Sequence, residues 1–118
     1  MLRLEWHKRA DGAWFGLDDV DVGQLLSGYG LFVIWKNGNE AQVSTVLYVG
    51  RGSLRDELLR CRRDPAFRQG LGLYVTWTTA SAEVLDPIAA YLYQQLRPLW
   101  GETVPLVAPL PVNLPLTA

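Results

Sequence analysis

Runs of apolar residues along the chain predict three strands. Residues 29–35 form a continuous apolar run rich in β-branched and aromatic side chains, which predicts a buried strand. Residues 43–50 form a second such run, and the Asn37-Gly38 turn signal between the two predicts an antiparallel hairpin. Residues 72–79 alternate apolar and polar side chains and predict a third strand. We expect these strands to pair in one antiparallel three-stranded sheet.

A helical pattern follows the second strand directly. We expect residues 51–53 to break the strand, with Ser53 as the cap of a helix over residues 54–62. Its apolar face would carry Leu54, Leu58 and Cys61. Asp64-Pro65 marks the end of this helix, because a proline disfavours helical geometry at the residue before it.

The last helix has two alternative starts. In the first, Asp86 is the N-cap and Pro87 takes the first helical position, which suits the fixed φ of proline. In the second, the helix begins within residues 81–85 and Pro87 lies in an early turn. Both versions run to Leu96 or Arg97 and stop before Pro98.

The two ends of the chain lie outside this pattern. Residues 2–6 alternate and predict a short edge strand, whereas residues 10–12 predict a turn. Residues 15–26 predict a short helix, because acidic residues suit a first helical turn. The acidic residues are Asp18, Asp19 and Asp21. The C-terminal stretch is rich in proline, so we expect an extended tail packed on the surface.

The order strand, strand, helix, strand, helix predicts an α+β fold, in which helices flank a small sheet. Mixed strands and helices without a repeating parallel unit support this class over a doubly wound fold. We expect a single domain over residues 1–118. Its core would span about residues 29–98, with an N-terminal extension over 1–28 and a proline-rich tail over 99–118.

Composition narrows the function classes. The 118 residues with 49% hydrophobic content suit one ordinary globular domain. The formal net charge of −1 gives no global positive field, so any contact with nucleic acid depends on a local patch. A single cysteine, Cys61, excludes an internal disulfide and a multi-cysteine metal site. We find no signal-peptide pattern and no apolar stretch of the roughly 20 residues that a membrane span needs, so we expect a cytoplasmic protein.

Two tripeptides in the hairpin strands carry a family resemblance. Gly30-Leu31-Phe32 lies in the first strand and Tyr48-Val49-Gly50 in the second, and an arginine-rich helix candidate follows at once. This arrangement resembles the GIY-YIG nuclease family over residues 29–98. The resemblance implies neighbouring strands that present two tyrosines to a shallow cleft. The first tripeptide ends in Phe32, so one of the two phenolic hydroxyl groups is missing.

Other residues fill the catalytic positions that the resemblance implies. With Leu54 as the leucine before the helix, the catalytic arginine position falls on Glu57 and a histidine or tyrosine position on Cys61. The metal-binding glutamate position falls on Ala89. The resemblance implies that the glutamate holds a divalent cation and that the arginine binds phosphate oxygens. Ala89 can ligate nothing, and Glu57 would repel a phosphate.

We therefore predict a catalytically inactive, GIY-YIG-like pseudonuclease domain that needs no cofactor and binds nucleic acid or a protein. Its binding residues would be Tyr48, Arg51, Arg55 and Arg60. Between residues 51 and 68, arginines exceed acidic residues by three, which favours a local patch for phosphates or an acidic partner. The interleaved acids equally fit a solvated helix surface with pairs such as Glu57–Arg60.

Two other hypotheses stay open. A divergent endonuclease that depends on Mg²⁺ or Mn²⁺ would use Tyr48, Arg60 and Asp86, because Asp86 lies three residues before Ala89 on a continuous helix. Asp86 would otherwise serve as a helix cap, and Arg60 as a solvated charge. A peptide- or protein-interaction domain without a nucleic-acid role would show an exposed aromatic patch instead. Trp14 and Trp100 are its candidate residues.

Overall fold

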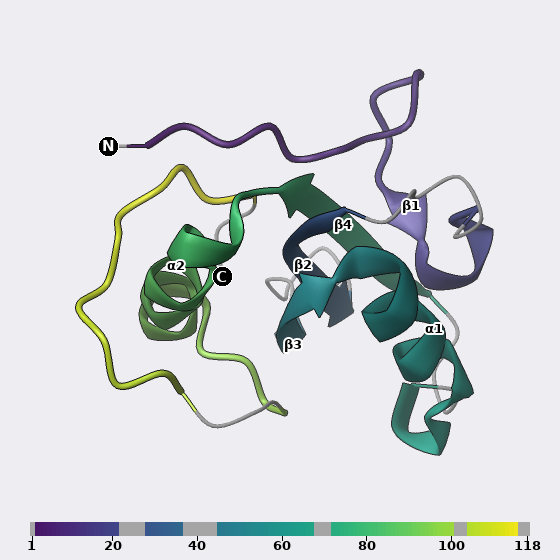
Figure 1. Ribbon diagram of the computed structural model, residues 1–118. Coiled ribbons are helices and arrows are strands. Elements are labelled where there is room, and N and C mark those ends of the chain that lie inside the picture. The colour runs from purple at the N-terminus through teal and green to yellow at the C-terminus, as the bar shows by residue number, and fades with distance from the viewer. Residues whose placement is uncertain (1, 22–27, 37–44, 68–71, 101–103, 116–118) are drawn as a thin grey trace.

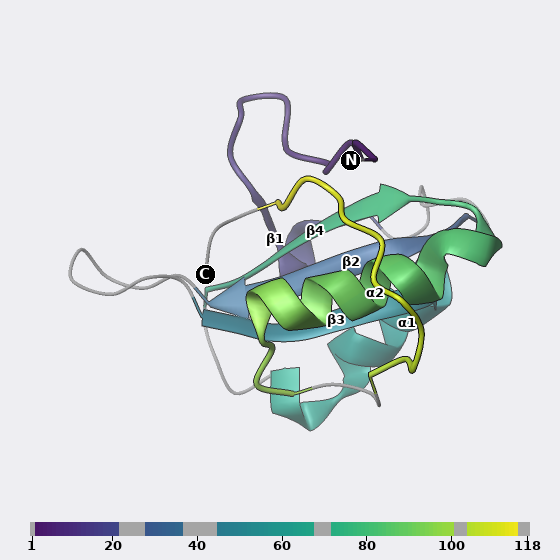
Figure 2. The same cartoon turned by 90° about the vertical axis from the view of Figure 1, so that its left-hand side faces the viewer.

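The computed structural model describes residues 2–21, 28–36, 45–67, 72–100 and 104–115. Within them the chain has an α+β fold, in which a four-stranded antiparallel sheet carries one α-helix on each face (Figures 1 and 2). The Cα radius of gyration is 13.5 Å, the value expected for a folded domain of this length. None of the helices described is long and apolar enough to cross a membrane.

The three predicted strands are confirmed. They are β2 (Tyr29–Lys36), β3 (Thr45–Ser53) and β4 (Leu73–Thr79). In the sheet order β1-β4-β2-β3, β2 pairs with both β3 and β4 and therefore lies inside the sheet. Because helices cover both of its faces, every residue between its ends is buried, and its sequence reads as one unbroken apolar run.

The expectation of a three-stranded sheet is corrected by a fourth, short strand. β1 (Phe15–Gly16) pairs antiparallel with β4, with Phe15 opposite Val75. A 3-10 helix, η1 (Leu17–Asp19), follows it, so no α-helix begins in the described part of the predicted helix over residues 15–26. The Phe15 ring packs against Trp77 with its centroid 5.0 Å away, and this tertiary contact outweighs the local acidic helix signal.

β3 extends beyond its predicted end. Residues 51–53 continue the ladder instead of breaking it, with Gly52 opposite Gly30 in β2. Gly52 has a φ of 121°, a conformation that a side chain would make costly. The pairing continues through Gly52 to Ser53, opposite Tyr29, directly before the following helix. The predicted Asn37-Gly38 turn lies outside the described residues.

The first helix has the predicted place and apolar face. α1 spans Leu54–Arg63 and ends at Asp64, ahead of a second 3-10 helix, η3 (Pro65–Phe67). Its buried residues are Leu54, Leu58 and Cys61. Ser53 occupies the N-cap position, but its side chain makes no capping hydrogen bond to the helix.

The last helix uses the earlier of its two alternative starts. α2 spans Ala82–Leu96 with Ser81 at the N-cap, so Pro87 lies inside the helix and Asp86 is not the cap. The earlier start adds a first turn that carries the buried Leu85 against the sheet. The helix ends at Arg97, which adopts a left-handed conformation with a φ of 47°, before Pro98.

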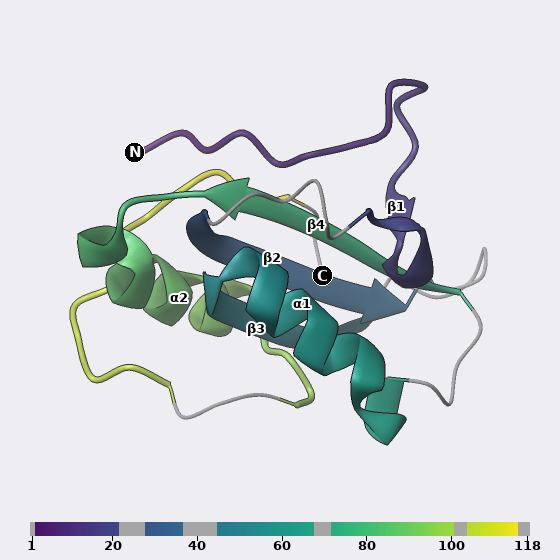
Figure 3. The same cartoon turned by 45° about the vertical axis from the view of Figure 1, so that its right-hand side comes forward.

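The sheet divides the hydrophobic core into two layers. On one face, Phe32, Ile34 and Tyr48 pack with the apolar side of α1. On the other, Leu31 and Val33 pack with α2. The turned views show α1 and α2 on opposite faces of the sheet (Figures 2 and 3). Successive strand residues point to opposite faces, which is why neighbours in β2 belong to different layers.

The two ends of the described chain lie against each other near α2 (Figure 1). The predicted edge strand over residues 2–6 is reduced to a single parallel bridge between Leu2 and Val112. The Leu110 amide donates to the Pro87 carbonyl at 3.0 Å, and Val112 is buried. The prolines at 105, 109 and 111 exclude regular ladder pairing. Residues 104–115 contain no helix and only the one bridge residue, Val112; Leu110 and Val112 attach this segment to the fold, whereas Leu106 is fully exposed.

Candidate functional site

Tyr48, Glu57 and Arg60 form a hydrogen-bonded cluster between β3 and α1, here called the Arg60 cluster. The Arg60 Nη2 donates to the Tyr48 hydroxyl at 2.8 Å. Nη2 and Nε of Arg60 also donate to Glu57 Oε2, at 2.8 and 3.1 Å. The predicted Glu57–Arg60 pair is thus confirmed. It forms because residues three apart lie on the same side of a helix.

The Arg60 guanidinium is held in its charged form by its partners in the cluster. The hydrogen bond to Glu57 raises the pKa of the Arg60 guanidinium above its usual value, Tyr48 adds to this, and partial burial opposes it. Arg60 therefore stays charged throughout the physiological pH range. Its side chain remains 49% exposed, so the guanidinium is oriented by the protein and is still accessible to a ligand.

Aromatic rings surround the Tyr48 side chain. Its ring lies between Phe32 and Phe67, with centroid distances of 5.7 and 5.6 Å, and Phe67 in turn contacts Trp100 at 5.5 Å. Tyr48 is only 6% exposed. Sequence reasoning did not find Phe67 or Trp100 as neighbours of Tyr48, since no local pattern links η3 or the chain after α2 to this strand.

Gly50 makes room for the Phe32 ring. A Cβ atom at Gly50 would lie 2.2 Å from the Cζ atom of Phe32 and 2.8 Å from a Tyr48 ring carbon. Such distances are far inside van der Waals contact. Phe32 is fully buried there. The second tripeptide therefore requires glycine for a packing reason, whatever the function of the site.

Arg51 and Asp86 belong to the opposite face of the sheet. Arg51 Nε donates to Asp86 Oδ1 at 2.7 Å, which links β3 to the first part of α2. Arg51 and Tyr48 are three residues apart on one strand, so their side chains point to different faces. The structure thus brings Arg60 to Tyr48 but places Asp86 with Arg51, and the four expected binding residues do not share one surface.

The remaining positions implied by the resemblance are buried. Ala89 lies fully buried on α2 against the sheet, and Cys61 is fully buried on α1. Neither contributes an accessible polar atom to the Arg60 cluster. Within the described residues, no group of three or more histidine, cysteine, aspartate or glutamate side chains is placed to hold a metal ion.

The outward side of α1 carries the accessible arginines. Arg55, Arg60 and Arg63 are exposed. Arg60 and Arg63 line a shallow hollow together with Asp56 and Asp64. Arg62 points elsewhere, because its guanidinium donates to the carbonyl oxygens of Leu17 and Val20 and so ties η1 to α1.

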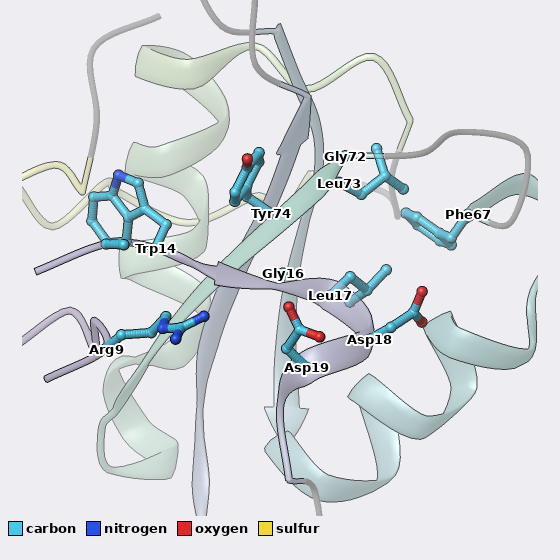
Figure 4. Close-up of a pocket in the computed structure, with 11 residues that line it drawn as sticks. Arg9, Trp14, Gly16, Leu17, Asp18, Asp19, Phe67, Gly72, Leu73 and Tyr74 are labelled. Carbon is cyan, nitrogen blue, oxygen red and sulfur yellow. The ribbon is translucent and has the colours of Figure 1, made fainter. Parts of the chain in front are cut away.

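A second hollow of about 430 Å³ lies beside β1 and the start of β4 (Figure 4). Its lining includes Trp14, Tyr74 and two exposed aspartates, Asp18 and Asp19. From the sequence, Asp18 and Asp19 were expected at the start of a helix. The two-residue strand β1, which brings them beside Tyr74, is too short to show an alternating pattern in the sequence.

Comparison with known proteins found no matching family model, no matching curated protein and no matching solved structure. The resemblance to GIY-YIG nucleases therefore rests on the two tripeptides and the residues that follow them.

Proposed function

We propose that this chain is a non-catalytic, GIY-YIG-like pseudonuclease domain that binds nucleic acid through the exposed arginines of α1. The observation that carries the proposal is the Arg60 cluster. Tyr48 and Glu57 fix the Arg60 guanidinium in one orientation, yet about half of the side chain faces solvent. A guanidinium held in this way offers directed donors to a phosphate oxygen at a reduced entropic cost.

The positions of the carboxylates support a non-catalytic role. Metal-assisted cleavage of a phosphodiester requires a carboxylate and a phosphate-binding group around one reacting atom. Here Glu57 already accepts two hydrogen bonds from Arg60, and Asp86 pairs with Arg51 on the other face of the sheet. The alanine at position 89 is buried and has no ligand atom in its side chain.

The charge distribution predicts weak, salt-dependent binding. The net charge of −1 gives no long-range attraction, so binding depends on Arg55, Arg60 and Arg63 along one side of α1. A phosphate at Arg60 competes with Glu57 for the same donors. We expect a contact with few phosphates and therefore a shallow dependence of affinity on salt.

Fluorescence anisotropy with labelled single-stranded, duplex and branched DNA and with RNA tests the proposal. We expect the double variant Arg55→Ala, Arg60→Ala to weaken binding by about tenfold or more and to flatten the salt slope by about one unit per lost phosphate contact. The control Arg3→Ala, Lys36→Ala removes two exposed positive charges away from α1 and should bind like the wild type. Equal losses in the two variants would contradict a specific role for α1.

A cleavage assay with Mg²⁺ or Mn²⁺ on the same substrates tests the absence of catalysis. We expect no cleavage that depends on the protein's own site. Cleavage by the wild type that disappears in the Tyr48→Phe, Asp86→Ala variant would overturn the non-catalytic proposal and support the divergent endonuclease. Equal cleavage rates for the wild type and the variant would indicate a contaminating nuclease. The binding measurement alone would then test the proposal.

A peptide- or protein-interaction domain is the second candidate, because large apolar side chains are exposed after α2. Leu106 is 99% exposed and Leu99 65%, and Trp100 and Val107 are also exposed. Crosslinking in the native cell followed by mass spectrometry separates the candidates. A protein partner lost in the Leu106→Ser variant but retained in the Arg55→Ala, Arg60→Ala variant would favour protein binding.

A further inference from the structure

The indole of Trp100 lies at the end of a row of contacts that begins at Arg60. The Arg60 guanidinium carbon is 5.9 Å from the centroid of the Tyr48 ring. The Tyr48 and Phe67 centroids are 5.6 Å apart, and those of Phe67 and Trp100 are 5.5 Å apart. Tyr48 and Phe67 both belong to the core layer that packs with α1. The guanidinium and the indole therefore lie on the same side of the sheet.

The two ends of this row are exposed to solvent, and its middle is not. Tyr48 and Phe67 are buried, whereas Trp100 is 42% exposed and the Arg60 side chain is 49% exposed. The planes of the Phe67 and Trp100 rings meet at 79°, so Phe67 covers at most one face of the indole. An exposed aromatic ring with a cation nearby is the combination that proteins use to bind single-stranded nucleic acid.

Backbone hydrogen bonds hold Trp100 in this place. The chain leaves α2 at Arg97 and runs toward the side of the sheet that carries α1 (Figure 2). The Leu99 amide donates to the Val46 carbonyl of β3 at 3.1 Å. The Trp100 amide donates to the Leu47 carbonyl at 2.8 Å. A ring on an anchored backbone loses little further freedom when a ligand stacks on it, which favours affinity.

The ring that supports Trp100 is fixed as well. The Phe67 amide donates to the Asp64 carbonyl at 3.0 Å, and the Ala66 amide donates to the Asp64 carboxylate at 2.9 Å. These bonds hold η3 against the end of α1. Because the Tyr48 hydroxyl accepts from Arg60, both ends of the row are fixed to the same core layer. The fold thus sets the separation of indole and guanidinium before any ligand binds.

We propose that the nucleic acid bound by this domain is single-stranded, with an unpaired base stacked on Trp100 and a phosphate of the same strand at Arg60. This inference rests on the proposed function and adds the class of ligand to it. The bases inside a duplex are already stacked on both faces, so an indole at the surface can stack only on a base outside a duplex. Such stacking tolerates any sequence, because every base has a π-face.

Fluorescence anisotropy of the full chain with three DNA probes of equal length tests the inference. The probes are a single strand of mixed sequence, its duplex, and the same single strand with every base removed to leave abasic sugars. The abasic strand keeps the phosphates and lacks the stacking faces. We expect the wild type to bind the single strand about fivefold or more tightly than either of the other probes. An RNA strand of the same sequence distinguishes DNA from RNA as the source of this chemistry.

Matched variants separate stacking from charge. We expect Trp100→Ala to weaken binding of the single strand by about fivefold or more and to leave the salt slope unchanged, because it removes a ring and no charge. Trp100→Phe keeps a smaller ring and should retain part of the affinity. The Arg55→Ala, Arg60→Ala variant should instead flatten the salt slope for every probe. The control Leu106→Ser removes an exposed apolar side chain from the chain after α2 and should bind like the wild type.

The outcomes separate this inference from the proposed function. The absence of saturable binding to every probe would overturn both. Equal affinity for the single strand and the abasic strand, or unchanged affinity in Trp100→Ala, would overturn only the single-strand inference; loss of a protein partner in Trp100→Ala would then assign the indole to a protein interface. An equal loss in Leu106→Ser would indicate general apolar contact and overturn it too. The comparison of probes uses the wild-type chain, so it decides the inference even where Trp100→Ala fails to fold.

Discussion

At the scale of single residues, the close fit of Gly50 and Phe32 gives a direct prediction. Any side chain at position 50 would collide with the buried Phe32 ring. We expect Gly50→Ala to lower the free energy of unfolding by about 1–3 kcal/mol, the usual range for overpacking a core. Urea denaturation of the purified variant measures this change.

A double-mutant cycle shows whether the Phe32 ring is the cause. Phe32→Leu shortens the side chain that would meet the new Cβ atom, so the double variant should cost less than the sum of the two single variants. Strict additivity would mean that Gly50 is required for another reason, such as its backbone conformation, and that the collision is relieved by a small shift of the strand.

Some of the residue contacts follow from local spacing, and others do not. Glu57 and Arg60 are three apart on a helix, so their pairing could be predicted from the sequence. The Arg51–Asp86 pair joins a strand to a helix 35 residues later. Predicting it requires the face of the sheet on which α2 packs, and no local pattern in the sequence specifies that face.

At the scale of elements, a bulge in β3 creates an attachment point for the chain after α2. The register between β2 and β3 shifts there, and Leu47 is the extra residue. A bulge turns two successive carbonyl groups to the same side. The carbonyls of Val46 and Leu47 accept hydrogen bonds from Leu99 at 3.1 Å and Trp100 at 2.8 Å. The chain's own backbone therefore covers the edge of the sheet at Val46 and Leu47.

Removal of the Leu99 amide hydrogen should weaken the attachment of this segment to the edge of β3. We expect Leu99→Pro to lower the free energy of unfolding by about 0.5–1.5 kcal/mol, the net value of one hydrogen bond. It should also promote association between molecules through the exposed edge of β3. Leu99→Ala keeps the amide and is the matched control. Urea denaturation and sedimentation velocity test both effects, and identical behaviour of the two variants would show that the backbone contact is unimportant.

Elements with strong periodic signals were predicted well, and those that depend on distant partners were not. The apolar run of β2 and the apolar stripe of α1 are local properties, so the sequence indicates them directly. β1 forms because Phe15 pairs with Val75 of β4 and its ring packs against Trp77. Over the described residues 15–21, a tertiary contact thus outweighed the weak local preference for the predicted helix.

At the scale of the whole molecule, the sheet separates two chemically different regions. Arg60 and Tyr48 lie on the α1 face, whereas the Arg51–Asp86 pair lies on the α2 face. An endonuclease site made of Tyr48, Arg60 and Asp86 would have to gather these residues around one reacting atom, whereas here Asp86 pairs with Arg51 on the other face of the sheet. This separation follows from strand geometry, and a change of side-chain rotamer cannot remove it.

The two ends of the described chain are joined by Asn113, and this gives a prediction about local stability. The Asn113 side chain accepts from the Leu4 amide and donates to the Leu4 carbonyl, the latter at 2.9 Å, and the Trp6 indole donates to the Asn113 carbonyl at 2.9 Å. We expect Asn113→Ala to lower the free energy of unfolding by about 1–2 kcal/mol, because two partly buried backbone groups of Leu4 lose their partners.

Amide hydrogen exchange shows which segments lose stability in Asn113→Ala. Leu4 and Leu110 belong to segments attached at the surface, so their amides should exchange faster in Asn113→Ala. The amide of Val33 in the buried β2 should change only by the small global effect. Asn113→Asp keeps the acceptor for the Leu4 amide but places negative charge beside the Leu4 carbonyl, so it should loosen the same segments. An equal increase in exchange at Leu4 and Val33 would mean that the two ends unfold together with the core and that Asn113 supports the whole fold.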